Sequence, residues 1–384
     1  MARPQPPLSL YVHFPWCVRK CPYCDFNSHK AGNNPPRDSY INALAADLRV
    51  EGDRSGGRLV TTAFLGGGTP SFFSPDEIAR VLESARRFLN ISADCEITME
   101  ANPGTLERGS LTDYRAAGVT RLSLGAQSFD ADTLKVLGRI HGPDDILSAC
   151  EDAREAGFES INIDLMFALP GQDLSAAVRD VQSLLQLAPA HISYYQLTLE
   201  PNTVFHQRPP PNIPDDDLAW EIQERCHELI ESAGYRKYEI SAFAQPGHEC
   251  RHNLNYWTFG DYVAIGAGAH GKVTDTAGVS WRYRKPANPQ AYIESLGSEQ
   301  HKAVAARIKT EDLGFEFMLN ALRLSDGFSE DDFKDRTGLE TAAVLATISG
   351  AVADGLIEEP RPGQWRPTAS GFRYLNDLQA RFLP

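Results

Sequence analysis

Residues 17–24 read Cys-Val-Arg-Lys-Cys-Pro-Tyr-Cys and closely follow the first apolar run of the chain, Leu8–Phe14. Three thiolates this near in sequence converge easily on one metal centre, and cysteine is the usual ligand of iron–sulfur clusters. Zinc is the competing interpretation, but zinc normally takes four protein ligands, and no fourth Cys or His stands at a natural zinc spacing. Cys17, Cys21 and Cys24 therefore suit a [4Fe-4S] cluster with one iron left open.

Length and composition bound the class of protein. The chain has 384 residues, 42% hydrophobic and 23% charged, which suits a soluble enzyme with one large and one smaller domain. Its net charge of -14 has the wrong sign for a phosphate-coating protein, so we expect no nucleic-acid partner. Seven cysteines, with three crowded near the start, are not a disulfide framework. The N-terminus lacks an apolar signal core and no run of about 18 apolar residues occurs, which predicts a cytoplasmic protein without a membrane span.

Strand-like and helix-like segments alternate through the first two thirds of the chain. Ser74 and Glu77 form a capping box before one helical pattern, and Gly118, Gly157 and Gly234 each stand where a helix should end. This alternation predicts parallel β/α units, and six units indicate an open, partial (β/α)6 barrel. The six apolar runs are Leu8–Phe14, Val60–Leu65, Glu96–Glu100, Val119–Leu124, Ser160–Phe167 and His191–Leu199.

Polar residues and glycines collect where these runs end. Ligands of parallel α/β folds bind beyond the carboxyl ends of the strands. The residues at those ends are Cys17, Gly66–Pro70, Glu100, Asn102 and Gln127, with Asp164 and Gln196 inside the last two runs. The sequence therefore predicts a site at this edge of the sheet.

The chain divides into three parts. We assign 1–241 to the partial barrel, 242–308 to a connecting segment rich in Gly and aromatic residues, and 309–384 to a winged-helix-like domain. From 310 to the end there are 7 Lys and Arg against 13 Asp and Glu. A DNA reader needs a basic face, so we expect this domain to pack against or cover a substrate.

The cysteine run, with the aromatic Tyr23 before its last cysteine, resembles the signature of the radical S-adenosylmethionine (SAM) superfamily. The stretch Gly66–Pro70, Gly-Gly-Gly-Thr-Pro, resembles that superfamily's glycine motif for the methionine end of the cofactor. Glycines there let the backbone approach a ligand closely.

Over nearly its whole length the chain resembles the oxygen-independent coproporphyrinogen III oxidase group, on the stretches Leu10–Cys17, Gly125–Phe129, Asn162–Leu165 and Leu169–Gln172. Within that group it is most similar to the HemW branch of haem chaperones. Phe26 stands where the oxidase has a further cysteine, and only ten residues precede Tyr11, where the oxidase has a long extension. Residues 252–257, His-Asn-Leu-Asn-Tyr-Trp, fit the HNxxYW motif of HemW.

The resemblance implies a role for each matching residue. Glu100 would hold the SAM ammonium, Arg139 its carboxylate and Asp164 its ribose hydroxyls. His252 is implied in haem binding, with His248 and Cys250 as alternatives nearby. His13 and His29 flank the cluster, and Cys95, Cys150 and Cys226 fit buried apolar positions. The full implied set is Cys17, Cys21 and Cys24 for the [4Fe-4S] cluster, and Tyr11, Tyr23, Gly67, Gly68, Thr69, Glu100, Gln127, Arg139 and Asp164 for SAM.

Two functions follow from the resemblance. The first is a haem chaperone that delivers haem to apo-haemoproteins such as membrane respiratory enzymes, with SAM cleavage and a homodimer left open. The second is coproporphyrinogen III oxidation, in which a 5′-deoxyadenosyl radical abstracts hydrogen from propionates and leaves vinyl groups and carbon dioxide. Phe26 and the short N-terminus favour the chaperone. A zinc-dependent transcription factor is a third interpretation, which the acidic C-terminal domain argues against.

Overall fold

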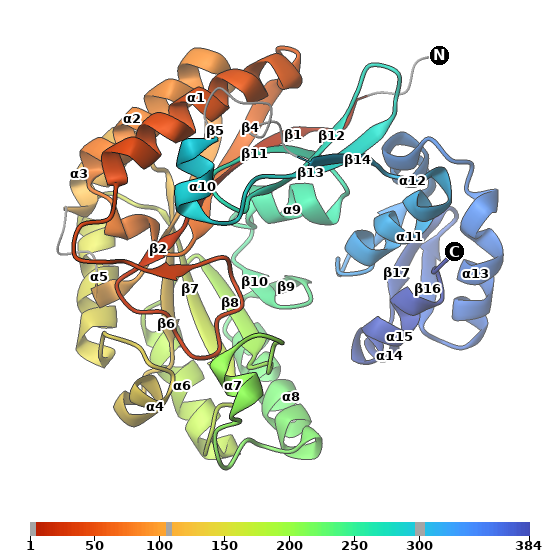
Figure 1. Cartoon of the computed structure of the whole chain (residues 1–384). Helices are drawn as coiled ribbons and strands as arrows, with labels where there is room; N and C mark the ends of the chain where they lie inside the picture. Colours follow the sequence, from red (N-terminus) through yellow and green to blue (C-terminus); the bar gives the residue numbers. More distant parts are fainter. Residues whose placement is uncertain (1–4, 105–109, 296–303) are drawn as a thin grey trace.

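The computed structural model describes residues 5–104, 110–295 and 304–384. Its main body is a 12-stranded sheet with the order β14-β13-β12-β11-β1-β4-β5-β6-β7-β8-β10-β9. A smaller, mostly helical unit at the C-terminal end lies beside it (Figure 1). No helix within the described ranges is long and apolar enough to cross a bilayer.

The centre of the sheet consists of six parallel strands, one for each predicted apolar run. The third strand begins earlier than predicted, and the fourth ends later, at Gln127. The sheet ends at β14 and β9 and does not close, so the predicted partial barrel is confirmed. The strands are β1 (Leu8–Phe14), β4 (Leu59–Gly67), β5 (Asn90–Ala101), β6 (Arg121–Gln127), β7 (Ser160–Phe167) and β8 (His191–Gln196).

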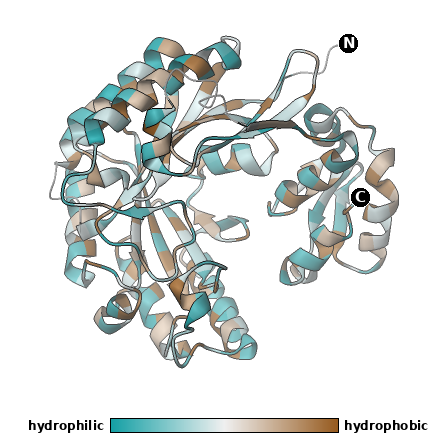
Figure 2. Ribbon diagram, viewed as in Figure 1, coloured by the Kyte–Doolittle hydropathy of each residue, from teal (hydrophilic) through white to brown (hydrophobic). Residues whose placement is uncertain are grey.

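Helices between these strands cover the outer side of the sheet (Figure 1). Figure 2 shows hydrophobic and hydrophilic residues along each of them, as expected for helices with one buried side. The predicted capping box is present: the Ser74 hydroxyl accepts from the Glu77 amide, and the Glu77 carboxylate accepts from the Ser74 amide. The helices are α1 (Arg37–Ser55), α2 (Pro75–Phe88), α3 (Leu111–Ala117), α4 (Ala131–Val136), α5 (Pro143–Glu155), α6 (Leu174–Gln186) and α8 (Asp216–Ser232).

Three of these helices end at the glycines that the sequence predicts. Gly118, Gly157 and Gly234 have φ of 113°, 81° and 94°, a region that glycine adopts without strain. Short elements complete the loops beyond the strands: β2 (Trp16–Cys17), β3 (His29–Lys30), the 3-10 turn η1 (Pro70–Phe72) and α7 (Val204–Gln207).

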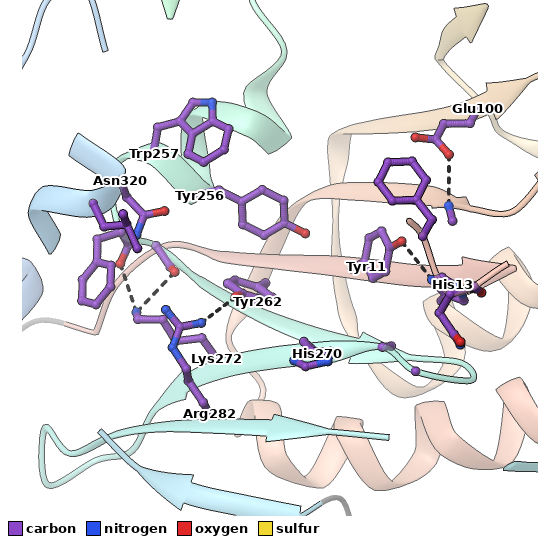
Figure 3. Close-up of a pocket in the computed structure, with 18 residues that line it drawn as sticks. Tyr11, His13, Glu100, Tyr256, Trp257, Tyr262, His270, Lys272, Arg282 and Asn320 are labelled. Atoms are coloured by element: carbon purple, nitrogen blue, oxygen red, sulfur yellow. Dashed lines mark hydrogen bonds between the residues drawn. The ribbon is translucent and has the colours of Figure 1, made fainter. Parts of the chain in front are cut away.

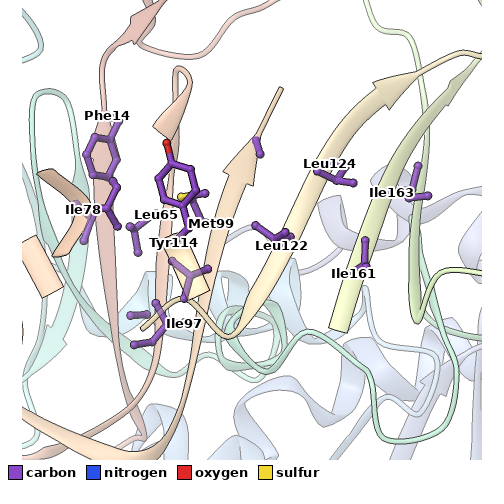
Figure 4. Close-up of a cluster of buried hydrophobic side chains, with 14 of the residues drawn as sticks. Phe14, Leu65, Ile78, Ile97, Met99, Tyr114, Leu122, Leu124, Ile161 and Ile163 are labelled. Carbon is purple, nitrogen blue, oxygen red and sulfur yellow. The ribbon is translucent and has the colours of Figure 1, made fainter. Parts of the chain in front are cut away.

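One continuous apolar cluster fills the space between the sheet and these helices (Figure 4). Phe14, Leu65, Met99 and Leu122 come from four neighbouring strands, and Ile78 of α2 packs against them; all five are fully buried. Strands buried on both faces are typical of parallel sheets. This packing fixes the carboxyl ends of the strands, and therefore the site, relative to one another.

The segment 242–308 extends the sheet at both of its edges. β10 (Ala242–Ala244) pairs with β8 and with β9 (Arg236–Glu239). β11 (Asp261–Ile265) is parallel to β1, and β12 (His270–Thr274), β13 (Ser280–Arg284) and β14 (Val304–Arg307) follow it as antiparallel strands. Two short helices, α9 (Arg251–Trp257) and α10 (Pro289–Glu294), lie in the same segment.

The C-terminal unit has its own core. Phe317 packs edge-on against Phe259, Phe328 and Phe333, and the cluster around it is separate from the main one. Three helices are followed by a strand pair and two terminal helices. The elements are α11 (Thr310–Ala321), β15 (Phe328–Ser329), α12 (Glu330–Thr337), α13 (Ala342–Ala353), β16 (Ile357–Arg361), β17 (Gln364–Pro367), α14 (Ala369–Arg373) and α15 (Leu375–Ala380).

A buried ion cluster ties α1 to the added edge of the sheet. Lys285 Nζ lies 2.5 Å from Asp47 Oδ1 and 2.7 Å from Glu51 Oε1, and all three side chains are 0% exposed. The hydroxyls of Tyr283 and Tyr292 donate to the same two carboxylates. Each buried charge thus has a partner, which is the condition for its burial.

We predict that Lys285→Met destabilises the protein by about 3–5 kcal/mol, because it removes the cation that lies between the buried Asp47 and Glu51 carboxylates. Lys135→Met is the matched control, since its ion pair with Asp132 is mostly exposed. The control should leave the urea-unfolding curve nearly unchanged. Equal shifts for the two variants in urea titrations would show that the buried cluster does not stabilise this edge.

Candidate functional site

A cavity of about 140 Å³ lies beyond the carboxyl ends of the central strands. Every residue predicted for the cluster and for SAM lines it, except Tyr11, which lines the adjoining cavity. The sheet gathers these residues from positions more than 140 residues apart: Cys17, Cys21, Tyr23, Cys24, Gly67, Gly68, Thr69, Glu100, Gln127, Arg139 and Asp164.

The three cysteines lie on one loop. Cys17 ends β2, and the Cys24 amide donates to the Cys21 carbonyl at 3.2 Å. Burial raises the pKa of Cys17 to about 11 and also raises the pKa of Cys24. Among the described residues, no three His, Cys, Asp or Glu side chains converge on a point for a single ion. The three thiols instead line one cavity, and as a donor set without a fourth cysteine they fit a [4Fe-4S] cluster with an open iron; binding of iron would release their protons.

Arg139 connects the cysteine loop to β6. Its Nη1 donates to Cys21 Sγ at 3.6 Å and its Nη2 to the Gly125 carbonyl at 2.7 Å. Its Nε is buried and has no hydrogen-bond partner among the described residues. A buried donor without a partner is rare in folded proteins. Arg139 therefore has a donor available for an acceptor on a ligand, such as a carboxylate.

Two carboxyl groups face the cavity without an ion-pair partner among the described residues, Glu100 on β5 and Asp164 on β7. Glu100 Oε2 accepts from the Gly67 amide at 3.0 Å, and Asp164 Oδ1 accepts from the Asn162 amide group at 2.7 Å. Burial, and then the nearby Asp164, raise the pKa of Glu100 to about 8. Burial also raises the pKa of Asp164. Two such groups suit a cationic ligand, and SAM carries a sulfonium and an ammonium.

The glycine loop after β4 is shaped by its neighbours in the chain. Gly67 has a φ of 108°, and a Cβ there would overlap the His13 ring. A Cβ on Gly68 would lie 2.7 Å from the Phe14 carbonyl oxygen. The close approach of this loop to β1 therefore requires the glycines, in addition to the approach of a ligand that the sequence predicts.

Several lining residues escape sequence analysis. Tyr195 donates to Gln127 Oε1 at 2.7 Å and lines the cavity, whereas the predicted Gln196 does not. Neighbouring residues of a strand point to opposite faces of the sheet, so a difference of one position decides which side chain lines the cavity. Gly125 leaves room for two side chains, since a Cβ there would lie 2.9 Å from Gln127 Nε2 and 3.1 Å from Arg139 Nη2.

A second cavity, of about 550 Å³, adjoins the first. Figure 3 shows the residues that line it. Gly67, Glu100 and Phe26 line both cavities. Phe26 is 58% exposed and contributes to the boundary that the two cavities share. The rest of the wall contains aromatic rings, cationic groups, small residues and two residues of α11: Tyr11, His13, Asn27, Tyr256, Trp257, Phe259, Gly260, Tyr262, Gly268, Ala269, His270, Lys272, Arg282, Leu319 and Asn320.

His252 lies behind this wall and not in it. It is 0% exposed; its Nδ1 shares a hydrogen bond with Thr62 Oγ1 at 3.0 Å and its Nε2 one with the Tyr256 hydroxyl at 2.8 Å. Burial lowers the pKa of His252 to about 3. In this conformation it orients Tyr256, whose ring does line the cavity, and its direct contact with haem stays a prediction.

The remaining candidates have other surroundings. His248, Cys250 and His29 line neither cavity, and His13 lines the larger one. Both His13 ring nitrogens are used, by the Tyr11 hydroxyl at 3.1 Å and the Asn27 carbonyl at 2.9 Å. The predicted burial of the other cysteines, Cys95, Cys150 and Cys226, is confirmed.

The fold and this site define a class of protein. A sequence model of the radical SAM superfamily matches residues 11–184, and one of the HemN C-terminal domain matches residues 308–374. A solved structure of coproporphyrinogen III oxidase (HemN) from Escherichia coli superposes with a TM-score of 0.84 over 98% of this chain and 90% of that chain. The two are 22% identical, so the likeness is one of fold. The protein has the radical SAM fold.

The particular family follows from relatives of full length. Proteins named heme chaperone HemW are 46% identical in Escherichia coli strain K12 and 44% identical in Haemophilus influenzae, each over 98% of both chains. The protein of that name from Bacillus subtilis is 35% identical over 98% of this chain and 99% of its own. The chain belongs to the HemW family.

We predict that Cys17→Ala, Cys21→Ala and Cys24→Ala each prevent assembly of a full [4Fe-4S] cluster, because each removes one of three thiolate ligands. Cys150→Ala, in the buried core away from the cavity, should keep it. Iron and sulfide content after anaerobic reconstitution, with the visible absorbance spectrum, measures this. A Cys21→Ala protein with a full cluster would refute the cluster assignment.

We also predict a pH dependence for SAM binding. Glu100, with its pKa near 8, is mostly protonated at pH 6.5 and must lose its proton to pair with a cation. The affinity of wild type relative to Glu100→Gln should therefore rise by up to about tenfold per pH unit below pH 8 and level off above it. Comparison with this variant cancels the titration of SAM itself. Calorimetric titration of reconstituted protein from pH 6 to 9 measures the ratio, and a constant ratio contradicts the assignment.

Proposed function

We propose that the protein is a haem chaperone of the radical SAM type, which binds a [4Fe-4S] cluster, SAM and haem and delivers haem to apo-haemoproteins such as respiratory enzymes. The observation that carries this proposal is the large aromatic cavity beside the cavity that the three cysteines line, which we call the cluster cavity. The chain is also 46% identical to a protein named heme chaperone HemW. A concave, mainly apolar space of several hundred cubic ångströms with a few cationic groups suits a flat porphyrin with carboxylate side chains.

In this proposal Cys17, Cys21 and Cys24 hold the cluster. When bound, the cluster and SAM together supply one-electron chemistry. Glu100 and Asp164 offer the negative charge that a sulfonium and an ammonium need, and Arg139 offers a buried donor to a carboxylate. The other predicted SAM residues shape the wall: Tyr11, Tyr23, Gly67, Gly68, Thr69 and Gln127.

The larger cavity is proposed as the haem site. Tyr256 and Trp257 of the HNxxYW motif belong to its wall, and their rings offer flat apolar surface for a porphyrin. Leu319 and Asn320 of α11 close another side, which supports the expectation that the C-terminal unit covers the cargo. His252 would support this wall through its hydrogen bond to Tyr256.

Phe26 supports a carrier in preference to an oxidase. By the resemblance, the oxidase has a further cysteine at this position, and Phe26 offers neither a thiol nor a proton. Its exposed ring instead adds apolar surface between the two cavities. We propose that the protein acts in the cytoplasm and passes haem on by direct contact with acceptors, as a monomer or a homodimer.

The proposal predicts haem binding and transfer without porphyrin synthesis. Anaerobically reconstituted protein should bind about one haem per protein chain and pass it to a purified apo-haemoprotein. With coproporphyrinogen III, SAM and reductant it should form no protoporphyrinogen IX. Absorbance titration and chromatography of porphyrins measure the two outcomes. Formation of protoporphyrinogen IX would favour the oxidase, and a failure to bind haem would refute the chaperone.

A further inference from the structure

The wall of the larger cavity contains two imidazoles among the described residues, His13 and His270. Both ring nitrogens of His13 are occupied by hydrogen bonds within the protein. His270, the first residue of β12, is exposed, and its side chain makes no hydrogen bond to any described residue. It is therefore the imidazole of this wall that can offer a nitrogen to a metal without a change in the protein (Figure 3).

The register of β12 and β13 shows what surrounds His270. Tyr283 on β13 points toward α1, where its hydroxyl donates to Glu51, and the space of a Cβ on Gly271 is filled by its ring. Side chains alternate along a strand, so the neighbours of Tyr283 and Gly271 face the opposite side of the sheet, and three of them, His270, Lys272 and Arg282, line the cavity. The register pairs His270 with Arg284 and Lys272 with Arg282. In a protein of net charge -14, this face carries four cationic or imidazole groups.

Two of these groups already form ion pairs within the protein. Lys272 Nζ donates to Asp261 Oδ1 at 3.0 Å, and Arg282 Nη2 donates to Glu316 Oε2 at 2.7 Å. Arg284 is exposed and has no ion pair or hydrogen bond to a described side chain, and it lies directly opposite His270. Cross-strand partners have Cβ atoms about 5 Å apart, so the imidazole and the guanidinium can reach one ligand.

We propose that His270 is an axial ligand of the haem iron and that Arg284 binds one haem propionate. This inference rests on the proposed haem function and names the residues that hold the cargo. A neutral imidazole is a common haem ligand, and a guanidinium fork matches a carboxylate. In this proposal the aromatic rings of the wall contact the porphyrin plane. His270 of β12 binds the iron, and Arg284 of β13 binds the carboxylate. His252 is then a positioning residue, which acts through Tyr256.

The test compares single variants of the full-length, cluster-loaded protein. His270→Ala should weaken haem binding by at least about tenfold and abolish the iron–histidine stretching band in resonance Raman spectra of the ferrous haem. Added free imidazole should restore the band. Arg284→Ala should weaken binding several-fold and keep the band. His206→Ala, an exposed histidine on α7 outside both cavities, is the control and should change neither property.

His252→Ala separates the two histidines. If His252 only positions Tyr256, its removal lowers the haem affinity together with the melting temperature and keeps the iron–histidine band. Loss of the band in His252→Ala, with retention in His270→Ala, would overturn the inference. Unchanged binding and an unchanged band in His270→Ala would also overturn it while leaving the haem chaperone intact. A wild-type protein that binds no haem would refute the proposed function itself.

Discussion

β1 is hydrogen-bonded to parallel strands on both of its sides, and both cavities depend on this double pairing. Its residues pair with β4 on one side and β11 on the other. The Tyr40 hydroxyl donates to the His13 carbonyl at 2.8 Å, and a Cβ on Gly266 would overlap the same carbonyl. These contacts hold the end of β1 in place. The cysteine loop that follows β1 lines one cavity, and Tyr11 and His13 of β1 line the other.

The two cavities share a pair of hydrogen-bonded lining residues. The Gly67 amide donates to Glu100, and both residues line the cluster cavity and the larger one. A change in the charge of Glu100, whose pKa is raised to about 8 by burial and by Asp164, is thus felt on both sides of the wall. Under the proposed function, this arrangement gives a physical route by which SAM bound near Glu100 would influence the larger cavity. Phe26 adds an apolar contact at the same boundary.

The parts of the fold that could be predicted are those with strong local signals. Long apolar runs predict the six parallel strands. Ser74 and Glu77 predict the start of a helix, and Gly118 predicts the end of another. The cysteine spacing and the polar residues at the strand ends predict which residues line the smaller cavity, because parallel strands bring their carboxyl ends to one edge of the sheet.

The parts that could not be predicted depend on tertiary context. β11 to β14 are short strands, and neither the pairing of β11 with β1 nor the antiparallel pairing of the other three leaves a periodic signal in the segment 242–308. A histidine in a motif does not reveal whether its ring faces a cavity, and the contacts of His252 with Thr62 and Tyr256 turn it into the interior. His270 carried no motif at all, and only the register of β12 with β13 brings it to the wall beside Arg284.

The most direct test of the account is anomalous diffraction at the iron absorption edge from crystals of the cluster-bound, haem-loaded protein, since it locates every iron. The account predicts one strong peak among Cys17, Cys21 and Cys24. It predicts a second peak in the adjoining cavity, within bonding distance of a ring nitrogen of His270. A second peak outside that cavity, on the surface or between two copies of the chain, would contradict it.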